Sequence, residues 1–247
     1  MLSATSVIEW EMTASDRSLR QQRSDRGTPA GISHMDMEDD VGVSSFTGPV
    51  AGALLAAGSS RRMRGLNKLI VPVRGEPALA KICAVALRTE LSPVIVVLGH
   101  EGAKVRESLE HLLKEHASRL RFVVNADYLE GRTSSIRAAV RALPAECDAV
   151  MFLRGDQPWV SETLIGDLVR VFREKKAALA FPVCRGRKGS PTIFARSHFG
   201  KLLDLRGDRG TLHLAEDLWD EAAKLEVEDA RCLTGIDTRE DLDRLSP

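Results

Sequence analysis

From about residue 47 onward, the hydrophobic residues gather into short continuous runs that alternate with amphipathic segments. A continuous run predicts a strand covered on both faces, and apolar residues three and four positions apart predict a helix. Strands are expected at 50–57, 93–98, 121–124, 149–153, 177–183 and 192–194. Helices are expected at 77–87, 103–113, 162–174 and 239–245, and a further helix is expected to begin within 130–137. This alternation predicts an α/β fold with three layers and a mostly parallel sheet.

Residues 1–46 differ from the rest of the chain. They show no sustained hydrophobic periodicity and are rich in Ser, Asp, Glu and Arg. Such a segment buries too little apolar surface to offset the entropy of the chain. We therefore expect a disordered N-terminal tail at 1–46 and one folded domain at 47–247. Acidic residues in the tail argue against a transit peptide.

Composition narrows the classes of partner. Lys and Arg number 35, and Asp and Glu also number 35, so charge gives no reason to expect a nucleic-acid or membrane surface. No apolar run reaches the roughly 18 residues needed to cross a bilayer. The four cysteines are far apart and form no Cys-x-x-Cys pair, which favours a reducing, cytoplasmic setting.

One loop carries most of the candidate chemistry. The first predicted strand breaks at Gly58 into small and cationic residues that continue to Lys68. Gly and Ser leave backbone N–H groups open to an anion, and Arg62 and Lys68 suit phosphate oxygens. A plain turn with solvated basic residues is an equally weighted alternative. A Walker A loop is excluded, because Lys68 follows Asn67 and precedes Leu69, and the spacing of Gly58 from Gly65 excludes a dinucleotide fingerprint.

Residues 55–63 read Leu-Ala-Ala-Gly-x-Ser-x-Arg-Met and are followed by Asn-Lys-Leu. This sequence motif resembles the signature of the MobA-like nucleotidyltransferases, most of all the molybdenum cofactor cytidylyltransferases. The resemblance implies that Arg62 and Lys68 bind a nucleotide triphosphate. It assigns nucleotide contacts to Leu55, Ala56, Ala57, Gly58, Ser59 and Ser60. The family usually has Gly directly after Met, where this chain has Arg64, and Arg would be strained there if the position requires a positive φ.

Two later segments extend the resemblance. Asn125, followed by Gly131 and Ser135 at a predicted helix start, resembles the second nucleotide-contact segment of the family; simple helix capping is the alternative. Asp156 follows a buried strand in a Gly-Asp-x-Pro sequence, which resembles the metal-binding motif of the family. One carboxylate together with substrate phosphates is adequate for Mg²⁺. Arg62, Lys68 and Asp156 are thus the expected catalytic residues.

The remaining matches concern the acceptor and a second metal ligand. The segments around 186–191 and 205–210 resemble acceptor-facing loops of the family. Tight glycine turns without a binding role are the alternative. They assign acceptor contacts to Gly189, Ser190, Pro191, Gly207 and Asp208. Ser190 stands where the family has Asn or His. Asp237 resembles a second metal ligand, and a helix N-cap at Asp237 or Thr238 is the alternative.

The resemblance implies a Rossmann-like fold of the nucleotide-diphospho-sugar transferase type, with a nucleotidyltransferase domain at 47–247. The implied reaction moves a nucleoside monophosphate from an NTP to a phosphorylated acceptor, molybdopterin, and releases pyrophosphate. CTP is favoured because guanylyl members tend to have Ala-Gly-Gly in place of Ala56-Ala57-Gly58. A molybdoenzyme or its chaperone is a further implied partner. The rivals are a sugar-phosphate or other small-molecule nucleotidyltransferase, and a non-catalytic nucleotide-binding chaperone of cofactor insertion.

Overall fold

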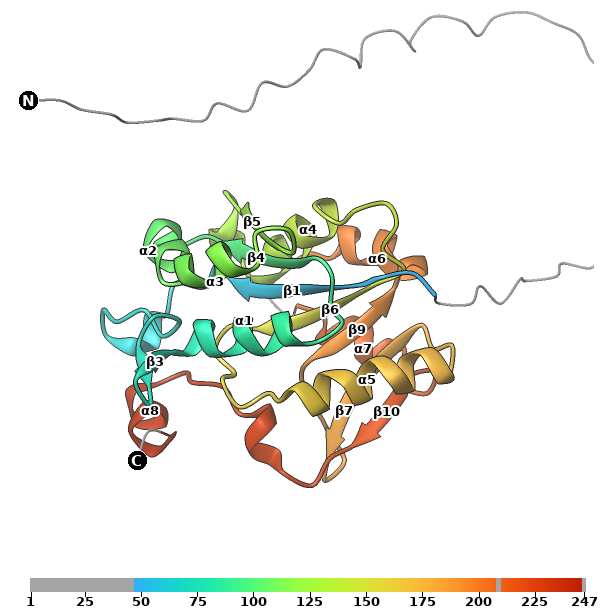
Figure 1. The fold of residues 1–247 in the computed structure, drawn as a ribbon. Helices are drawn as coiled ribbons and strands as arrows, with labels where there is room; N and C mark the ends of the chain where they lie inside the picture. Colours follow the sequence, from blue (N-terminus) through green and yellow to red (C-terminus); the bar gives the residue numbers. More distant parts are fainter. Residues whose placement is uncertain (1–46, 208–209, 246–247) are drawn as a thin grey trace, which may run out of the picture. The chain divides into compact units, whose positions relative to one another are not determined.

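A computed structural model describes residues 47–207 and 210–245 of the chain. The expected tail at 1–46 and the expected acceptor residue Asp208 lie outside these residues. The described chain forms one sheet of eight strands in the order β10-β7-β9-β6-β1-β4-β5, with β8 paired to β7, and a separate β2–β3 ladder (Figure 1).

The strands confirm the predicted α/β architecture. Their bounds are β1 Val50–Ala56, β2 Pro72–Val73, β3 Glu76–Pro77, β4 Val94–Leu98, β5 Leu120–Val124, β6 Ala149–Arg154, β7 Leu179–Cys184, β8 Arg187–Lys188, β9 Thr192–Ala195 and β10 Ala223–Glu226. The pairs β1–β4, β1–β6, β4–β5 and β7–β10 are parallel. Antiparallel pairs join β9 to β6 and to β7. The main sheet is therefore mostly parallel.

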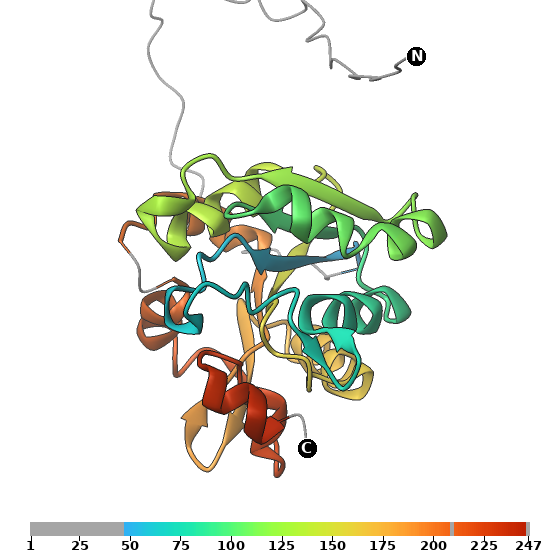
Figure 2. The ribbon, with the colours of Figure 1, turned by 90° about the vertical axis from the view of Figure 1, so that its left-hand side faces the viewer.

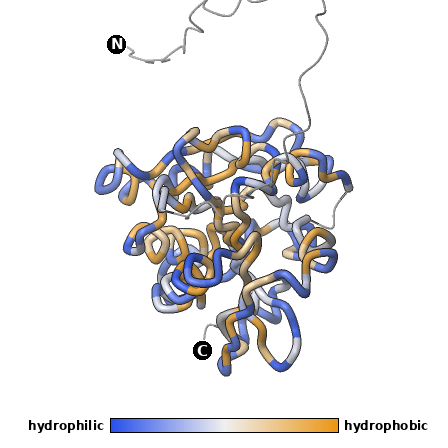
Figure 3. Tube along the Cα trace, turned by 90° about the vertical axis from the view of Figure 1, so that its right-hand side faces the viewer, coloured by the Kyte–Doolittle hydropathy of each residue, from blue (hydrophilic) through white to orange (hydrophobic). Residues whose placement is uncertain are grey.

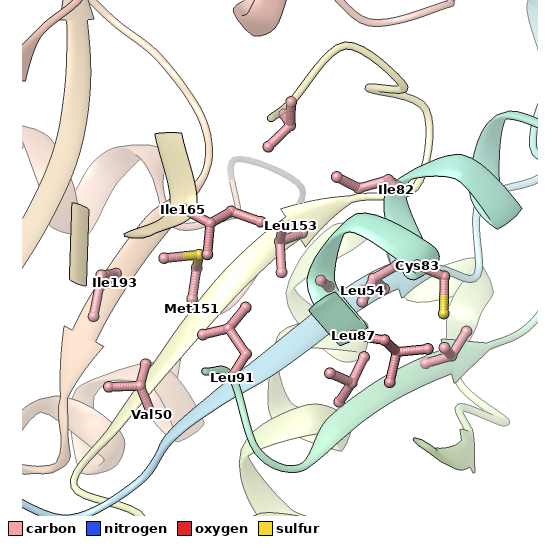
Figure 4. Close-up of a cluster of buried hydrophobic side chains, with 14 of the residues drawn as sticks. Val50, Leu54, Ile82, Cys83, Leu87, Leu91, Met151, Leu153, Ile165 and Ile193 are labelled. Carbon is pink, nitrogen blue, oxygen red and sulfur yellow. The ribbon is translucent and has the colours of Figure 1, made fainter. Parts of the chain in front are cut away.

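Helices cover both faces of the sheet. Their bounds are α1 Ala78–Arg88, α2 Gly102–Glu107, α3 Glu110–Glu115, α4 Arg132–Arg141, α5 Glu162–Glu174, α6 Phe199–Asp204, α7 Leu212–Asp217 and α8 Arg239–Leu245. Residues of α1, α3 and α5 pack with one face of β1 in a cluster that includes Leu54, Leu87 and Ile165 (Figures 1 and 4). The opposite face, with Ala53, packs with α4 and α6. This is the three-layer arrangement, with hydrophobic segments running through the interior (Figure 3).

One predicted element is wrong, and several short elements were not expected. The single helix expected at 103–113 is broken into α2 and α3. At the break, the Ser108 hydroxyl donates to the carbonyl of Val105 at 2.7 Å, a local bond that competes with helix continuation. Helices α6 and α7 and strand β10 have only 6, 6 and 4 residues, too short for a clear periodic pattern.

Distant parts of the chain meet at the end of the sheet where β1 and β6 finish. The loop after β1, the β2–β3 ladder and α8 gather there (Figures 1 and 2). Met63, Val73, Ala78 and Ile236 form a small buried cluster, against which Leu242 of α8 packs. This cluster anchors the cationic loop to the C-terminal segment. In the described chain, every helix is too short or too polar to span a bilayer.

Candidate active site

A cavity of about 420 Å³ opens at the carboxyl ends of β1 and β6. Open α/β sheets bind ligands at this edge. Its walls come from the loop after β1, the start of α4 and the end of β6. They comprise Leu55, Ala57, Gly58, Ser59, Arg61, Lys68, Leu69, Tyr128, Leu129, Glu130, Gly131, Arg132, Ser135, Arg154 and Asp156.

The loop after β1 turns through a short 3-10 helix, η1 (Arg61–Met63), held by its own side chains. The backbone N–H of Lys68 donates to the Ser60 hydroxyl at 3.1 Å, and Met63 is fully buried. Ser60 and Arg64 both lie in the left-handed region with φ of 49°. The position after Met63 thus has the positive φ that favours glycine, and Arg64 occupies it at a cost in backbone energy.

Cations and carboxylates from three distant segments meet at one edge of this cavity. The Lys68 ammonium donates to Asp156 and, at 2.7 Å, to Oδ1 of Asp237. Arg62 lies 3.0 Å from the same Asp237 oxygen. Arg154 makes two hydrogen bonds to Asp156, each of 3.0 Å. Arg62, Lys68, Asp156 and Asp237 therefore lie on one side of the molecule and in direct contact.

Asp237 is placed by the backbone around it. The N–H of Ile236 donates to the carbonyl of Asp156 at 2.9 Å, which ties the C-terminal segment to the loop after β6. A Cβ on Gly235 would lie 2.8 Å from the end of the Arg154 side chain, so glycine leaves room for the guanidinium beside Asp156. Thr238 caps α8 by accepting the N–H of Asp241, whose carboxylate accepts from the N–H groups of Asp237 and Thr238 in return. The N-cap is thus Thr238, and the Asp237 side chain faces Lys68.

The ion cluster changes the proton affinity of its members. Burial alone would raise the pKa of Asp237, but the hydrogen bond and charge of Lys68, helped by Arg154 and Arg62, hold it below its usual value. Burial likewise opposes the charge of Arg154, yet Asp156 keeps the pKa of Arg154 above its usual value. Sequence reasoning missed Arg154. Its signal was a cation at the last position of an otherwise apolar strand, directly before Gly-Asp.

The donor set fits a divalent cation that also binds phosphate. Asp156 and Asp237 present two carboxylates, and within 47–207 and 210–245 no group of three His, Cys, Asp or Glu side chains is arranged for a metal. Mg²⁺ is commonly held by one or two carboxylates, with substrate phosphates and water completing its shell. Both carboxylates are now bridged by Lys68, so their charge is already balanced within the protein.

The expected nucleotide-binding residues divide into two groups. Leu55, Ala57, Gly58, Ser59, Gly131 and Ser135 line the cavity, whereas Ala56, Ser60 and Asn125 do not. Buried Asn125 instead donates to the hydroxyls of Ser134 and Ser135 at 2.8 and 3.1 Å, which fixes the start of α4. Arg61, Tyr128 and Leu129 line the cavity and were not singled out from the sequence.

A second hollow of about 390 Å³ adjoins the first, and the two share Leu55, Arg132 and Arg154 in their walls. Of the expected acceptor residues, Gly189 and Ser190 line it, and Pro191 is buried beside them. Gly207 borders a different hollow, and its carbonyl accepts a hydrogen bond from the Thr133 hydroxyl.

Comparison with known proteins identifies the family of this domain. The model of the MobA-like NTP transferase domain matches residues 52–223. The purine catabolism protein PucB of Bacillus subtilis (strain 168) is 34% identical over 199 residues, which cover 78% of this chain and 93% of PucB.

Among solved structures, Rv0371c from Mycobacterium tuberculosis H37Rv has a TM-score of 0.69 at 25% identity, over 80% of this chain and 97% of that one. Its complex with manganese has a TM-score of 0.67 at 25% identity, over 80% and 98%. The family match spans well over half of the chain. The chain therefore belongs to the MobA-like NTP transferase family, within the nucleotidyltransferases.

Proposed function

We propose that this protein transfers a nucleoside monophosphate from CTP to molybdopterin, a phosphorylated acceptor, and releases pyrophosphate. One observation carries the proposal: Arg62 and Lys68 contact Asp156 and Asp237 at the edge of the first cavity, which Lys68 and Asp156 line. Arg154, paired with Asp156, lines both hollows at their junction. A nucleotide triphosphate needs cations and a metal on one side and an acceptor on the other, and this junction offers both. Membership of the family supports the reaction class.

Arg62 and Lys68 are proposed to turn from the carboxylates to the β and γ phosphates of the nucleotide. Arg supplies a planar pair of donors, and Lys supplies a compact charge. Asp156 and Asp237 would hold Mg²⁺, which when bound supplies positive charge to the phosphate oxygens. The base would lie against Leu55, Ala57 and Gly58, and near Ser135 at the start of α4.

In the proposed reaction an oxygen of the acceptor phosphate forms a bond to the α phosphorus of CTP. The bond from that phosphorus to the α–β bridging oxygen breaks, and pyrophosphate leaves with the electron pair. An ionised phosphate is already a nucleophile, so the protein needs no general base. Arg154 lines both hollows and is therefore placed to stabilise charge at the junction.

The choice of CTP and molybdopterin rests on the loop spelling at 55–63, and the runner-up acceptor is a sugar phosphate. We also propose the cytoplasm as the compartment. Cys83, Cys147 and Cys184 are free and buried, which fits a reducing environment.

The test is pyrophosphate release by the purified protein with each of the four NTPs, Mg²⁺, and either molybdopterin or glucosamine 1-phosphate. Turnover with CTP and molybdopterin is expected. Turnover only with the sugar phosphate would overturn the assignment of molybdopterin as acceptor. Turnover with another NTP would overturn the assignment of CTP. Nucleotide binding by calorimetry without turnover for any pair would favour the non-catalytic chaperone.

A further inference from the structure

The second hollow is lined by several cations, of which Arg154 is paired with Asp156. Its described lining includes Arg132, Arg154, Arg187 and Lys188 but no carboxylate, whereas the first cavity has Glu130 and Asp156 among its walls. A concentration of one sign of charge in a concave site attracts ligands of the opposite sign. The hollow is therefore suited to a small anionic molecule.

Lys188, on the short strand β8, forms no ion pair with any carboxylate of residues 47–207 and 210–245. Its ammonium donates to the carbonyl of Gly189 at 3.3 Å and to the hydroxyl of Thr192 at 3.1 Å. It also lies 5.2 Å from the centre of the Phe181 ring. All of these partners are uncharged. Burial lowers the pKa of Lys188 to about 8, and Glu216 opposes that change only at longer range.

Gln157, which also lines this hollow, has an unpaired polar atom. Gln157 is 1% exposed, and its amide N–H donates to the carbonyl of Leu233 at 2.7 Å. Its Oε1 atom has no hydrogen-bond partner within the described part of the chain. Buried polar atoms are nearly always satisfied, so an orphan in the wall of a hollow points to a ligand that carries a donor.

We propose that Lys188 binds the phosphate-bearing acceptor in the second hollow and selects acceptors by their negative charge. The inference rests on the proposed function, because it takes this hollow as the acceptor site. It assigns to Lys188 a role in acceptor affinity rather than in the binding of the nucleotide, which contacts the other cavity.

A binding role and a structural role predict opposite effects on stability. A partly desolvated ammonium without a counter-ion weakens the folded state, so a neutral side chain of similar length should be tolerated or stabilising. If Lys188 instead acted as a structural tie between β8 and β9, its loss would lower the thermal unfolding midpoint. Sites that carry binding function often sacrifice stability in this way.

The experiment compares Lys188→Met and Lys188→Arg with a control, Lys114→Met, on the exposed side of α3. For Lys188→Met we expect the KM for molybdopterin to rise about tenfold or more, which is one power of ten in affinity. The KM for CTP should stay within about twofold, and the unfolding midpoint should not fall. Lys188→Arg should retain most of the acceptor affinity. An unchanged acceptor KM, or a lower unfolding midpoint with no change in KM, would overturn the inference.

A second probe separates this inference from the proposed function. Inorganic phosphate is titrated calorimetrically into protein saturated with CTP without metal, and into protein alone if CTP does not bind. Phosphate affinity should fall about fivefold or more in Lys188→Met but not in Lys114→Met, whether or not turnover is found. Equal phosphate affinity in both variants would refute the anion site. If Lys188→Met loses phosphate affinity while the wild-type protein shows no turnover, only the proposed reaction is refuted.

Discussion

The two adjoining hollows share a wall but differ in how their charges are balanced. In the first, Lys68 contacts Asp156 and Asp237, and each carboxylate has a second cation nearby. In the second, Lys188 contacts two neutral oxygens and an aromatic ring. In the first site both carboxylates are paired with cations before any ligand enters. In the second, the Lys188 ammonium is paired with no carboxylate of the described chain.

This difference determines what each site can accept. A divalent cation entering the first site alone would face Lys68 between its two ligands, and the repulsion would weaken its binding. A metal that arrives with triphosphate brings enough negative charge to draw Lys68 and Arg62 away. The second site needs only an anion. We therefore expect metal and nucleotide to bind the first site together, and the acceptor to bind the second by its own charge.

The largest effect is expected at Asp156. Asp156→Asn keeps the size of the side chain but removes the charge that balances Lys68 and Arg154 and that would hold Mg²⁺. Pyrophosphate release should fall about a thousandfold, or on the order of 4 kcal/mol in the barrier. Asp167→Asn, on the exposed surface of α5, is the control and should leave the rate unchanged. Circular dichroism establishes that both variants fold. Wild-type rates in Asp156→Asn would refute the metal assignment and remove the contrast between the hollows.

A smaller effect is expected in metal binding itself. With Mn²⁺ as a paramagnetic probe, the dissociation constant measured by electron paramagnetic resonance should decrease about tenfold or more when CTP is present. Lys68→Met should tighten Mn²⁺ binding to the nucleotide-free protein, because the ammonium between the carboxylates is gone. Lys104→Met, which loses only a surface pair with Glu101, is the control. Equal Mn²⁺ affinity with and without CTP would contradict the view that the Lys68 ammonium occupies the site between the two carboxylates.

The parts of this site that sequence could predict are local. The apolar runs of β1 and β6 place the Gly58 loop and Asp156 at one edge of a parallel sheet, because all parallel strands end there in the same sense. The spelling around Met63 then identified a position that favours glycine, and φ of Arg64 is positive as that reasoning required. The type of each element and the chemistry of the loops follow from short-range patterns.

What sequence could not predict depends on contacts between remote segments. Lys68 and Asp237 are separated by 169 positions. The packing of Ile236 in the cluster with Met63, and its backbone hydrogen bond to Asp156, bring them together. Asn125 looked like a nucleotide ligand, but its amide is directed to Ser134 by the fold of α4. The sequence shows the charge of Lys188, whereas the structure is needed to show that no described carboxylate forms an ion pair with it.

The charge imbalance of the second hollow should also appear in the pH dependence of folding. The pKa of Lys188 is about 8 in the folded protein, against about 10.4 for an unfolded lysine. Between these values the unfolded chain binds more protons, so stability should increase with pH, on the order of 1 kcal/mol.

The groups that accompany Lys188 around the hollow are Arg132, Arg154, Arg187, Cys184 and Glu216. These groups and the rest of the chain are the same in Lys188→Met, so their contribution to the pH dependence of stability is common to both proteins. Urea unfolding from pH 7 to 10.5 should therefore show a steeper gain in stability for the wild type than for Lys188→Met. Parallel curves would mean that the Lys188 ammonium is as well solvated when folded as when unfolded.

The smallest effect is expected at Arg64, and it separates loop shape from charge in the first cavity. Arg64 has φ of 49° and precedes Gly65 with φ of 89°, so Arg64→Gly should relieve roughly 1 kcal/mol of backbone strain, partly offset by the greater freedom of glycine when unfolded. Arg74→Gly is the matched control, because Arg74 has φ of 55° and also precedes a glycine, but it loses a contact with Trp159. Thermal unfolding should show Arg64→Gly as the more stable of the two.

The Arg64 side chain lies outside the walls of the first cavity, so CTP affinity should stay within about twofold if paired charges govern nucleotide binding. A large change in CTP affinity would show instead that the backbone shape of the loop sets it.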